Sequence, residues 1–245
     1  MSRRNYPGDL IIEGLSKRIG TIQALDNVSL NVARGEIVGL FGRDGAGKTI
    51  CFEAIMGLVS IDSGRITLDG RDITRLTLDE RGPLGISYLA QGNSIFGGMT
   101  TAENIAAVLE VTEPDEATRA NRLEELLAEF NIAYVRDVPA PRLSGGERRR
   151  TEVARAMATS PAIMLLDEPF AGIDPMSVAA LRSTIRKLRD LDIGVLLSDQ
   201  NVREATRIID RAYVMDRGRV IFEGSPDEML ADAEVHLRYL GDGFH

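Results

Sequence analysis

One segment constrains the fold of this chain more than any other, the glycine-rich run Gly42-Arg43-Asp44-Gly45-Ala46-Gly47-Lys48-Thr49, which fits the pattern G-x-x-x-x-G-K-[ST]. The apolar run Glu36–Phe41 before it is typical of a strand buried on both faces, and Lys48–Leu58 after it has helical character. A glycine-rich turn between such a strand and a helix presents backbone amides to a phosphate chain. Lys48 adds a positive charge near the outer phosphates, and the Thr49 hydroxyl can hold magnesium. The alternative, a turn with an incidental lysine, leaves this strand–turn–helix context unexplained.

A second segment, Ile163–Glu168, places two carboxylates at the carboxyl end of an apolar strand. Ligands bind at this edge of open α/β sheets. Asp167 suits a magnesium shell, and Glu168 suits the orientation or deprotonation of an attacking water. The alternative interpretation is a pair of solvated acids at a strand end.

A third segment, Leu143-Ser144-Gly145-Gly146-Glu147, combines a helix-capping box with two glycines in the first helical turn. Glycine there lowers helix propensity, but it is favoured where a backbone must approach a ligand closely. A helix N-terminus with exposed amides is also an anion site. The following Arg148–Arg150 is more typical of a solvated helix face than of a nucleic-acid patch.

Composition excludes several other classes. The chain has 245 residues and a formal net charge of −8, which argues against a generic nucleic-acid coat. Its one cysteine, Cys51, excludes an internal disulfide and a Cys-cluster zinc site. Both histidines, His236 and His245, lie in the last ten residues, which argues against a Ser-His-Asp hydrolase and a His-rich metal site.

The termini and hydropathy predict a cytoplasmic protein. No apolar run approaches the ~20 residues of a membrane span, and residues 1–8 lack the apolar centre of a signal peptide. We expect residues 1–6 to form a frayed tail, and any contact with a membrane to be made through a partner.

The remaining pattern predicts an α/β core interrupted by a helical insertion of about seventy residues. Strands are expected at 10–15, 28–32, 64–68, 85–89, 162–166, 194–197, 212–215 and 219–222. Capping signals at Thr100, Ser144, Asp174 and Ser225 predict helix starts, and a further helix is expected to run through Phe130.

Along the chain, the segments follow in the order Gly42–Thr49, Leu143–Glu147 and Ile163–Glu168. In this order they resemble the motifs of the ATP-binding subunits of ABC transporters, and the resemblance covers nearly the whole chain. It implies an α/β fold with a P-loop NTPase (RecA-like) core, an antiparallel β subdomain and an inserted α-helical subdomain. Residues 8–245 would form one ATPase domain, with 8–90 and 160–225 as the core, 91–159 as the helical subdomain and 226–245 as a C-terminal helical tail.

The same resemblance implies further roles. Gln91 matches the Q-loop glutamine that contacts magnesium and the reaction centre, and Asp174 matches the D-loop. Two copies would form a head-to-tail homodimer that holds each ATP with Mg2+. Each ATP would lie between Gly42–Ile50 of one copy and Ser144–Glu147 of the other. Membrane permease subunits would dock near Gln91 and Phe96 and hold the protein on the cytoplasmic face of the inner membrane. No nucleic-acid partner is expected. Phe96 could instead be a minor core residue.

Within this family, four segments resemble the ATPases of lipopolysaccharide export: Leu143–Arg150, Leu165–Pro175, Ser94–Phe96 and Tyr239–Phe244. The ATPases of branched-chain amino-acid importers share the layout and a similar tail, and they are the alternative. Their usual residues after Ser-Gly-Gly differ from those here.

Four positions depart from the family pattern. Gln200 replaces the switch histidine and cannot take a positive charge near neutral pH, so we expect slower turnover with ATP binding retained. Ile19 falls where an aromatic residue usually stacks on adenine. Ile50 replaces a second hydroxyl residue, and Asp44 replaces a frequent asparagine.

These departures raise a second hypothesis, a hydrolysis-weakened regulatory subunit. Hydrolysis is favoured because the chain retains Glu168, Lys48, Thr49, Asp167 and Gln91. A third hypothesis, a soluble ABC-type ATPase acting on DNA or ribosomes, would need tandem cassettes or long coiled-coil insertions that do not fit in 245 residues.

Overall fold

The structure is a computed structural model that describes residues 9–92 and 94–241. The expected frayed tail (1–6), the end of the 239–244 motif and His245 lie outside these residues. The strands are β1 (Leu10–Ile19), β2 (Ile22–Val32), β3 (Ile37–Phe41), β4 (Ser63–Leu68), β5 (Arg71–Asp72), β6 (Ile86–Leu89), β7 (Ile163–Asp167), β8 (Gly194–Ser198), β9 (Arg211–Asp216) and β10 (Arg219–Gly224).

Helices connect these strands. The α-helices are α1 (Lys48–Met56), α2 (Leu78–Arg81), α3 (Thr101–Thr112), α4 (Glu116–Glu129), α5 (Gly145–Met157), α6 (Pro175–Asp190), α7 (Val202–Ala205), α8 (Pro226–Ala231) and α9 (Ala233–Val235). Single-turn helices lie at η1 (Gly82–Leu84), η2 (Ala133–Val135) and η3 (Ala140–Arg142), and α9 continues into a π-helical turn, η4 (His236–Leu240). No helix in the described part of the chain is long and apolar enough to cross a membrane.

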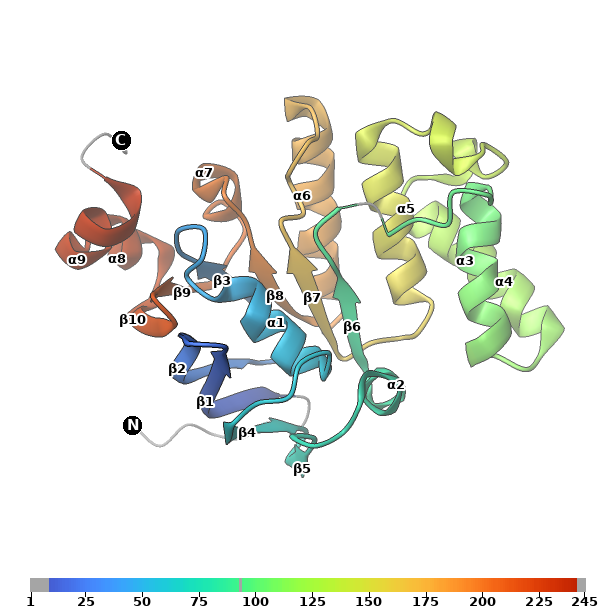
Figure 1. Cartoon of the computed structure of the whole chain (residues 1–245). Helices are drawn as coiled ribbons and strands as arrows, with labels where there is room; N and C mark the ends of the chain where they lie inside the picture. The colour runs from blue at the N-terminus through green and yellow to red at the C-terminus, as the bar shows by residue number, and fades with distance from the viewer. Residues whose placement is uncertain (1–8, 93, 242–245) are drawn as a thin grey trace.

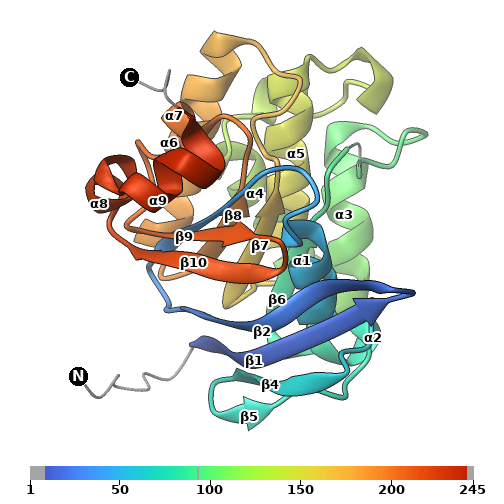
Figure 2. The same ribbon diagram turned by 60° about the vertical axis from the view of Figure 1, so that its left-hand side comes forward.

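Two sheets organise the molecule. The central sheet has the order β10-β9-β3-β8-β7-β6, and its strands are parallel except for β10. The second sheet is antiparallel, with the order β2-β1-β4-β5. Helix α1 lies between the two sheets, whereas α3, α4 and α5 lie together beyond the β6 edge (Figures 1 and 2). The expected α/β core with an antiparallel sheet and a helical insertion is confirmed.

Burial explains why the central strands carry unbroken apolar runs. Every residue of β3, β7 and β8 is buried, because helices and the second sheet cover both faces of the central sheet. One apolar cluster joins α1 and the antiparallel sheet to one face, and another joins α3–α6 to the opposite face. The carboxyl ends of β3, β7 and β8 therefore meet at one edge, which bears the first two sequence motifs.

The first two strands are longer than predicted. The expected strands at 10–15 and 28–32 are parts of the longer β1 and β2, which pair up to Ile19 and Ile22 across a tight turn. Gly14 and Asn27 have positive φ values of 62° and 55° in the region where the pairing register shifts. These irregularities break the alternation of apolar and polar residues, so the pattern showed only the regular ends.

Candidate functional site

The glycine-rich loop Gly42–Thr49, hereafter the P-loop, connects β3 to α1 as expected. A Cβ atom at Gly42 would lie 2.3 Å from the Met215 carbonyl oxygen, and one at Gly47 would lie 2.6 Å from the Ala24 carbonyl oxygen. Both glycines also have positive φ values, so only glycine fits these positions. The neighbouring strands β2 and β9 therefore fix the shape of the loop.

Lys48 is the first residue of α1 and is 7% exposed. Its Nζ donates hydrogen bonds to the carbonyl oxygens of Gly42 (2.7 Å) and Arg43 (3.2 Å). Burial lowers the pKa of the Lys48 amine, and the nearby carboxylates of Asp44, Glu168 and Asp167 oppose this effect. The lysine thus supplies positive charge to a cleft that contains several acids.

Asp167 ends β7 and is almost fully buried. Its Oδ1 accepts a hydrogen bond from the Ser198 hydroxyl, and its Oδ2 accepts one from the Tyr88 hydroxyl at 3.3 Å. Burial and the charge of Asp167 raise the pKa of Tyr88, so the phenol keeps its proton and remains a donor. Both oxygens of Asp167 are therefore already oriented by neighbouring strands.

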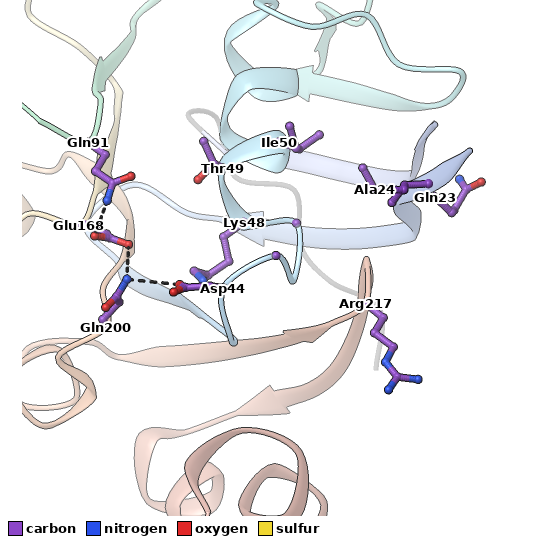
Figure 3. Close-up of a pocket in the computed structure, with 13 residues that line it drawn as sticks. Gln23, Ala24, Asp44, Lys48, Thr49, Ile50, Gln91, Glu168, Gln200 and Arg217 are labelled. Carbon is purple, nitrogen blue, oxygen red and sulfur yellow. Dashed lines mark hydrogen bonds between the residues drawn. The ribbon is translucent and has the colours of Figure 1, made fainter. Parts of the chain in front are cut away.

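Glu168 follows in the left-handed region, with φ 49°, which is rare for a residue with a side chain. Its amide donates to the Ser198 carbonyl oxygen at 2.8 Å, which fixes this conformation. Such strain costs of the order of 1–3 kcal/mol and clusters at functional sites. The strained backbone turns the Glu168 side chain into the cleft (Figure 3).

Two glutamines hold the Glu168 carboxylate. Gln91 Nε2 donates to Glu168 Oε2 at 2.7 Å, and Gln200 Nε2 donates to Glu168 Oε1 at 3.1 Å. Gln200 Nε2 also donates to Asp44 Oδ1 at 3.3 Å, which extends the chain of bonds to the P-loop (Figure 3). The buried Asp199 supports the Gln200 segment, since its oxygens accept from the amides of Phe170 (2.8 Å) and Asn201 (2.7 Å).

A cleft of about 520 Å³ unites these groups. Nine of its lining residues belong to the predicted site: Asp44, Gly45, Gly47, Lys48, Thr49, Ile50, Gln91, Glu168 and Gln200. Sequence reasoning missed the other four: Ile22, Gln23, Ala24 and Arg217. They come from β2 and the β9–β10 turn, which no motif marks. The Gly42, Arg43 and Ala46 backbones support the loop without lining the cleft.

Ile19 is not among the residues that line the cleft. Ile22 lines the cleft instead; it is 69% exposed and pairs with Ile19 across the β1–β2 hairpin. A hairpin turn separates the two residues, so the isoleucine at the cleft lies three positions after the predicted one. The sequence analysis did not predict this hairpin, and no sequence motif marks Ile22 as a lining residue.

The third motif lies outside the cleft. Ser144 caps α5: its Oγ accepts from the Glu147 amide at 3.3 Å, and its own amide donates to Glu147 Oε2 at 2.8 Å. A Cβ atom at Gly146 would lie 2.4 Å from Ser177 Oγ, so Gly146 lets α5 pack closely against α6. Within a single chain, the packing of α5 against α6 therefore already requires glycine at position 146. Asp174 caps α6 and accepts from two backbone amides, of Met176 and Ser177, both at 3.0 Å.

The prediction of a solvated face at Arg148–Arg150 is wrong for Arg149, which is 7% exposed. Arg149 forms an ion pair with the buried Glu152 at 2.9 Å. Its other terminal nitrogen donates to the carbonyl oxygens of Asp167 (3.2 Å) and Glu168 (3.3 Å). Glu152 in turn accepts from the Ser94 amide at 2.8 Å. The third motif is thus tied to the second motif and to the segment after Gln91, which local charge patterns could not reveal.

Phe96 is 45% exposed, which favours a surface role over a core role. The Arg155 guanidinium lies over its ring, 4.5 Å from the centroid. Asn104 fixes the backbone of Phe96 by accepting from its amide at 2.8 Å and donating to its carbonyl oxygen at 3.1 Å. The ring is therefore held at the surface.

Comparisons with known proteins agree with this architecture. A family model described as "ABC transporter" matches residues 25–171. A probable ABC transporter ATP-binding protein of Azorhizobium caulinodans is 52% identical, covering 97% of this chain and 84% of the relative. The lipopolysaccharide export system ATP-binding protein LptB of Haemophilus influenzae is 45% identical, covering 96% of this chain and 98% of the relative.

Solved structures give the same picture. The ADP conformation of MJ1267, an ATP-binding cassette of an ABC transporter, superposes with a TM-score of 0.85 at 27% identity, covering 95% of this chain and 98% of that one. The dimeric post-hydrolysis state of the cassette MJ0796, bound to ADP and Pi, superposes with a TM-score of 0.77 at 25% identity, covering 89% and 98%.

Proposed function

The chain belongs to the ABC transporter family as an ATP-binding cassette, and from this premise we propose that it hydrolyses Mg-ATP to power lipopolysaccharide export from the inner membrane. The observation that carries the proposal is the Glu168 carboxylate, held between Gln91 and Gln200 in the same cleft as Lys48 and Thr49. A carboxylate with both oxygens fixed can orient a water and accept its proton.

The P-loop would bind the phosphates, whereas Glu168 would act on the attacking water. Backbone amides of the P-loop and the Lys48 amine bind the phosphates and offset their negative charge. Gln91 and Gln200 orient Glu168, and Gln200 can also donate a hydrogen bond to the terminal phosphate. Gln23 and Ala24 lie at the other end of the cleft, where they would contact the base (Figure 3).

The donor set fits magnesium. Mg2+ is usually held by one or two protein oxygens together with waters and substrate phosphates. Thr49 lines the cleft, and Asp167 lies behind it with both oxygens already accepting hydroxyl bonds, so Asp167 suits contact through water. Within residues 9–92 and 94–241, no group of three or more His, Cys, Asp and Glu side chains could hold a metal alone. The ion, when bound, would neutralise phosphate charge.

The active unit is proposed to be a head-to-tail homodimer. Ser144–Glu147 and Asp174 lie outside the cleft of their own chain, so they are available to a second copy. The α5 N-terminus presents amides that suit an anion. The dimeric arrangement of the similar MJ0796 cassette supports this proposal.

The cargo is inferred from relatives. The LptB proteins of Haemophilus influenzae and Escherichia coli are each 45% identical to this chain over 236 residues. The alternative cargo, branched-chain amino acids, is not favoured, because both of these relatives are named for lipopolysaccharide export. The hydrolysis-weakened alternative is likewise not favoured, since Lys48, Asp167 and Glu168 are all in place.

Permease subunits are proposed to dock beside Gln91 and Phe96, and the protein would be peripheral on the cytoplasmic face of the inner membrane. The test is to purify the chain from membranes under mild detergent and identify the integral subunits that accompany it. Permeases of lipopolysaccharide export support the proposal, and amino-acid permeases with a binding protein would contradict it.

Replacing Gln200 with histidine is expected to raise the ATP turnover about fivefold. An imidazole can carry positive charge near neutral pH, which stabilises charge at the terminal phosphate better than a neutral amide does. Steady-state phosphate release checks this, with Gln200→Asn as a control that keeps an amide. Unchanged turnover in Gln200→His would show that the missing charge is not what limits the reaction.

A further inference from the structure

Asp44 is the one P-loop residue whose carboxylate joins the hydrogen-bond chain of the cleft. It is exposed between Gly42 and Gly45, and its side chain points inward, toward Lys48 and Gln200 (Figure 3). Its Oδ1 accepts from Gln200 Nε2 at 3.3 Å. Among the nearby acids, Asp44 does most to raise the pKa of the Lys48 amine against the lowering effect of burial.

Both hydrogens of the Gln200 amide nitrogen have carboxylate acceptors. Its Nε2 carries two hydrogens, and it has two carboxylate partners, Asp44 at 3.3 Å and Glu168 at 3.1 Å. A terminal phosphate that needs this donor must displace one of them. Glu168 is also held by Gln91 and by its strained backbone, whereas Asp44 lies on an exposed loop.

The direction of the cleft decides which phosphate meets Asp44. Gln23 and Ala24 mark one end, and Gln91, Glu168 and Gln200 mark the other (Figure 3). A nucleotide whose reacting phosphate faces Glu168 places its terminal phosphate between Lys48 and Gln200. A γ-phosphate would reach this position, whereas the phosphates of ADP would end before it.

We propose that Asp44 is an internal competitor for the γ-phosphate. Its carboxylate occupies the Nε2 of Gln200, so the γ-phosphate of ATP must displace it, whereas ADP leaves it in place. The proposal rests on the proposed function, since it requires ATP to bind with its γ-phosphate at Glu168. Asp44 therefore weakens ATP binding selectively and reduces the preference for ATP over ADP.

The test is the Asp44→Asn variant, which keeps the shape of the side chain and removes its charge. Dissociation constants are measured by calorimetry for a non-hydrolysable ATP analogue and for ADP, each with Mg2+. We expect affinity for the analogue to rise about tenfold and affinity for ADP to change less than about threefold. Asp137→Asn, an exposed acid on the helical insertion, is the control for net charge and should leave both constants unchanged.

A double-mutant cycle tests the role of Gln200. In the Gln200→Ala background, the gain from Asp44→Asn should fall below about threefold, because the shared donor is gone. Equal gains for both nucleotides would overturn the proposal, since a simple electrostatic effect does not separate them. An undiminished gain in the Gln200→Ala background would overturn it as well. Failure of the wild-type protein to bind either nucleotide would instead contradict the proposed function.

Discussion

Replacing Glu168 with glutamine should lower ATP turnover at least about 100-fold while leaving ATP binding intact. The amide keeps the size of the side chain and one accepting oxygen for Gln91 or Gln200, but it cannot accept a proton from water. Loss of one general base typically costs 10²- to 10⁴-fold in rate. Phosphate release measures turnover, and size-exclusion chromatography with Mg-ATP should show an accumulated ATP-bound dimer.

The matched control for this experiment is Glu110→Gln, which makes the same change at an exposed position of α3, outside the cleft. Its turnover should equal that of the wild-type protein. If wild type shows no turnover above Glu168→Gln, the assignment of this chain as a working motor fails. Normal turnover in Glu168→Gln would remove Glu168 from its proposed role.

Replacing Arg149 with alanine should destabilise the protein by about 3–5 kcal/mol, because it leaves the buried Glu152 without its ion-pair partner. For a chain of this size, that loss lowers the melting temperature by roughly 10 °C. Turnover should fall too, since Arg149 also binds the carbonyl oxygens of Asp167 and Glu168. Thermal unfolding followed by circular dichroism measures the first effect, and phosphate release measures the second.

The chain supplies its own control for burial. Arg122 and Glu125 form an ion pair of the same residue types and the same i,i+3 spacing at 3.0 Å, but on the surface of α4. Exposed pairs are worth about 0.2–1 kcal/mol, so Arg122→Ala should change the melting temperature by no more than a few degrees. Similar losses in the two variants would show that the burial of Arg149 is not the source of its stabilising effect. The double variant Arg149→Met/Glu152→Leu should recover most of the lost stability.

Much of the site could be predicted because its chemistry is local in the chain. The P-loop carries its glycines, lysine and threonine within eight residues, and Asp167 and Glu168 follow directly on a buried strand. The strand that precedes each motif is an unbroken apolar run, which marks burial on both faces. These features predicted the core of the fold and six residues of the cleft, and the family resemblance added Ile50, Gln91 and Gln200.

The missed residues have no such local signal. Ile22, Gln23 and Ala24 lie on β2, and Arg217 lies in the β9–β10 turn, so only the packing of two sheets brings them to the cleft. The regular pattern of β1 and β2 is interrupted near Gly14 and Asn27, which concealed the hairpin that places Ile22.

The sequence by itself determined the phosphate-binding loop, the paired carboxylates and the order of motifs, because each of these depends on neighbouring residues. The tertiary structure alone decided that Asp44 meets Gln200, 156 residues apart, and that Arg149 is buried against Glu152 and β7. Charge patterns describe a helix or loop in water, whereas burial and side-chain pairing depend on which elements pack together. The P-loop sequence thus predicts phosphate binding, and the fold places Asp44 against the Gln200 amide that we propose the γ-phosphate needs.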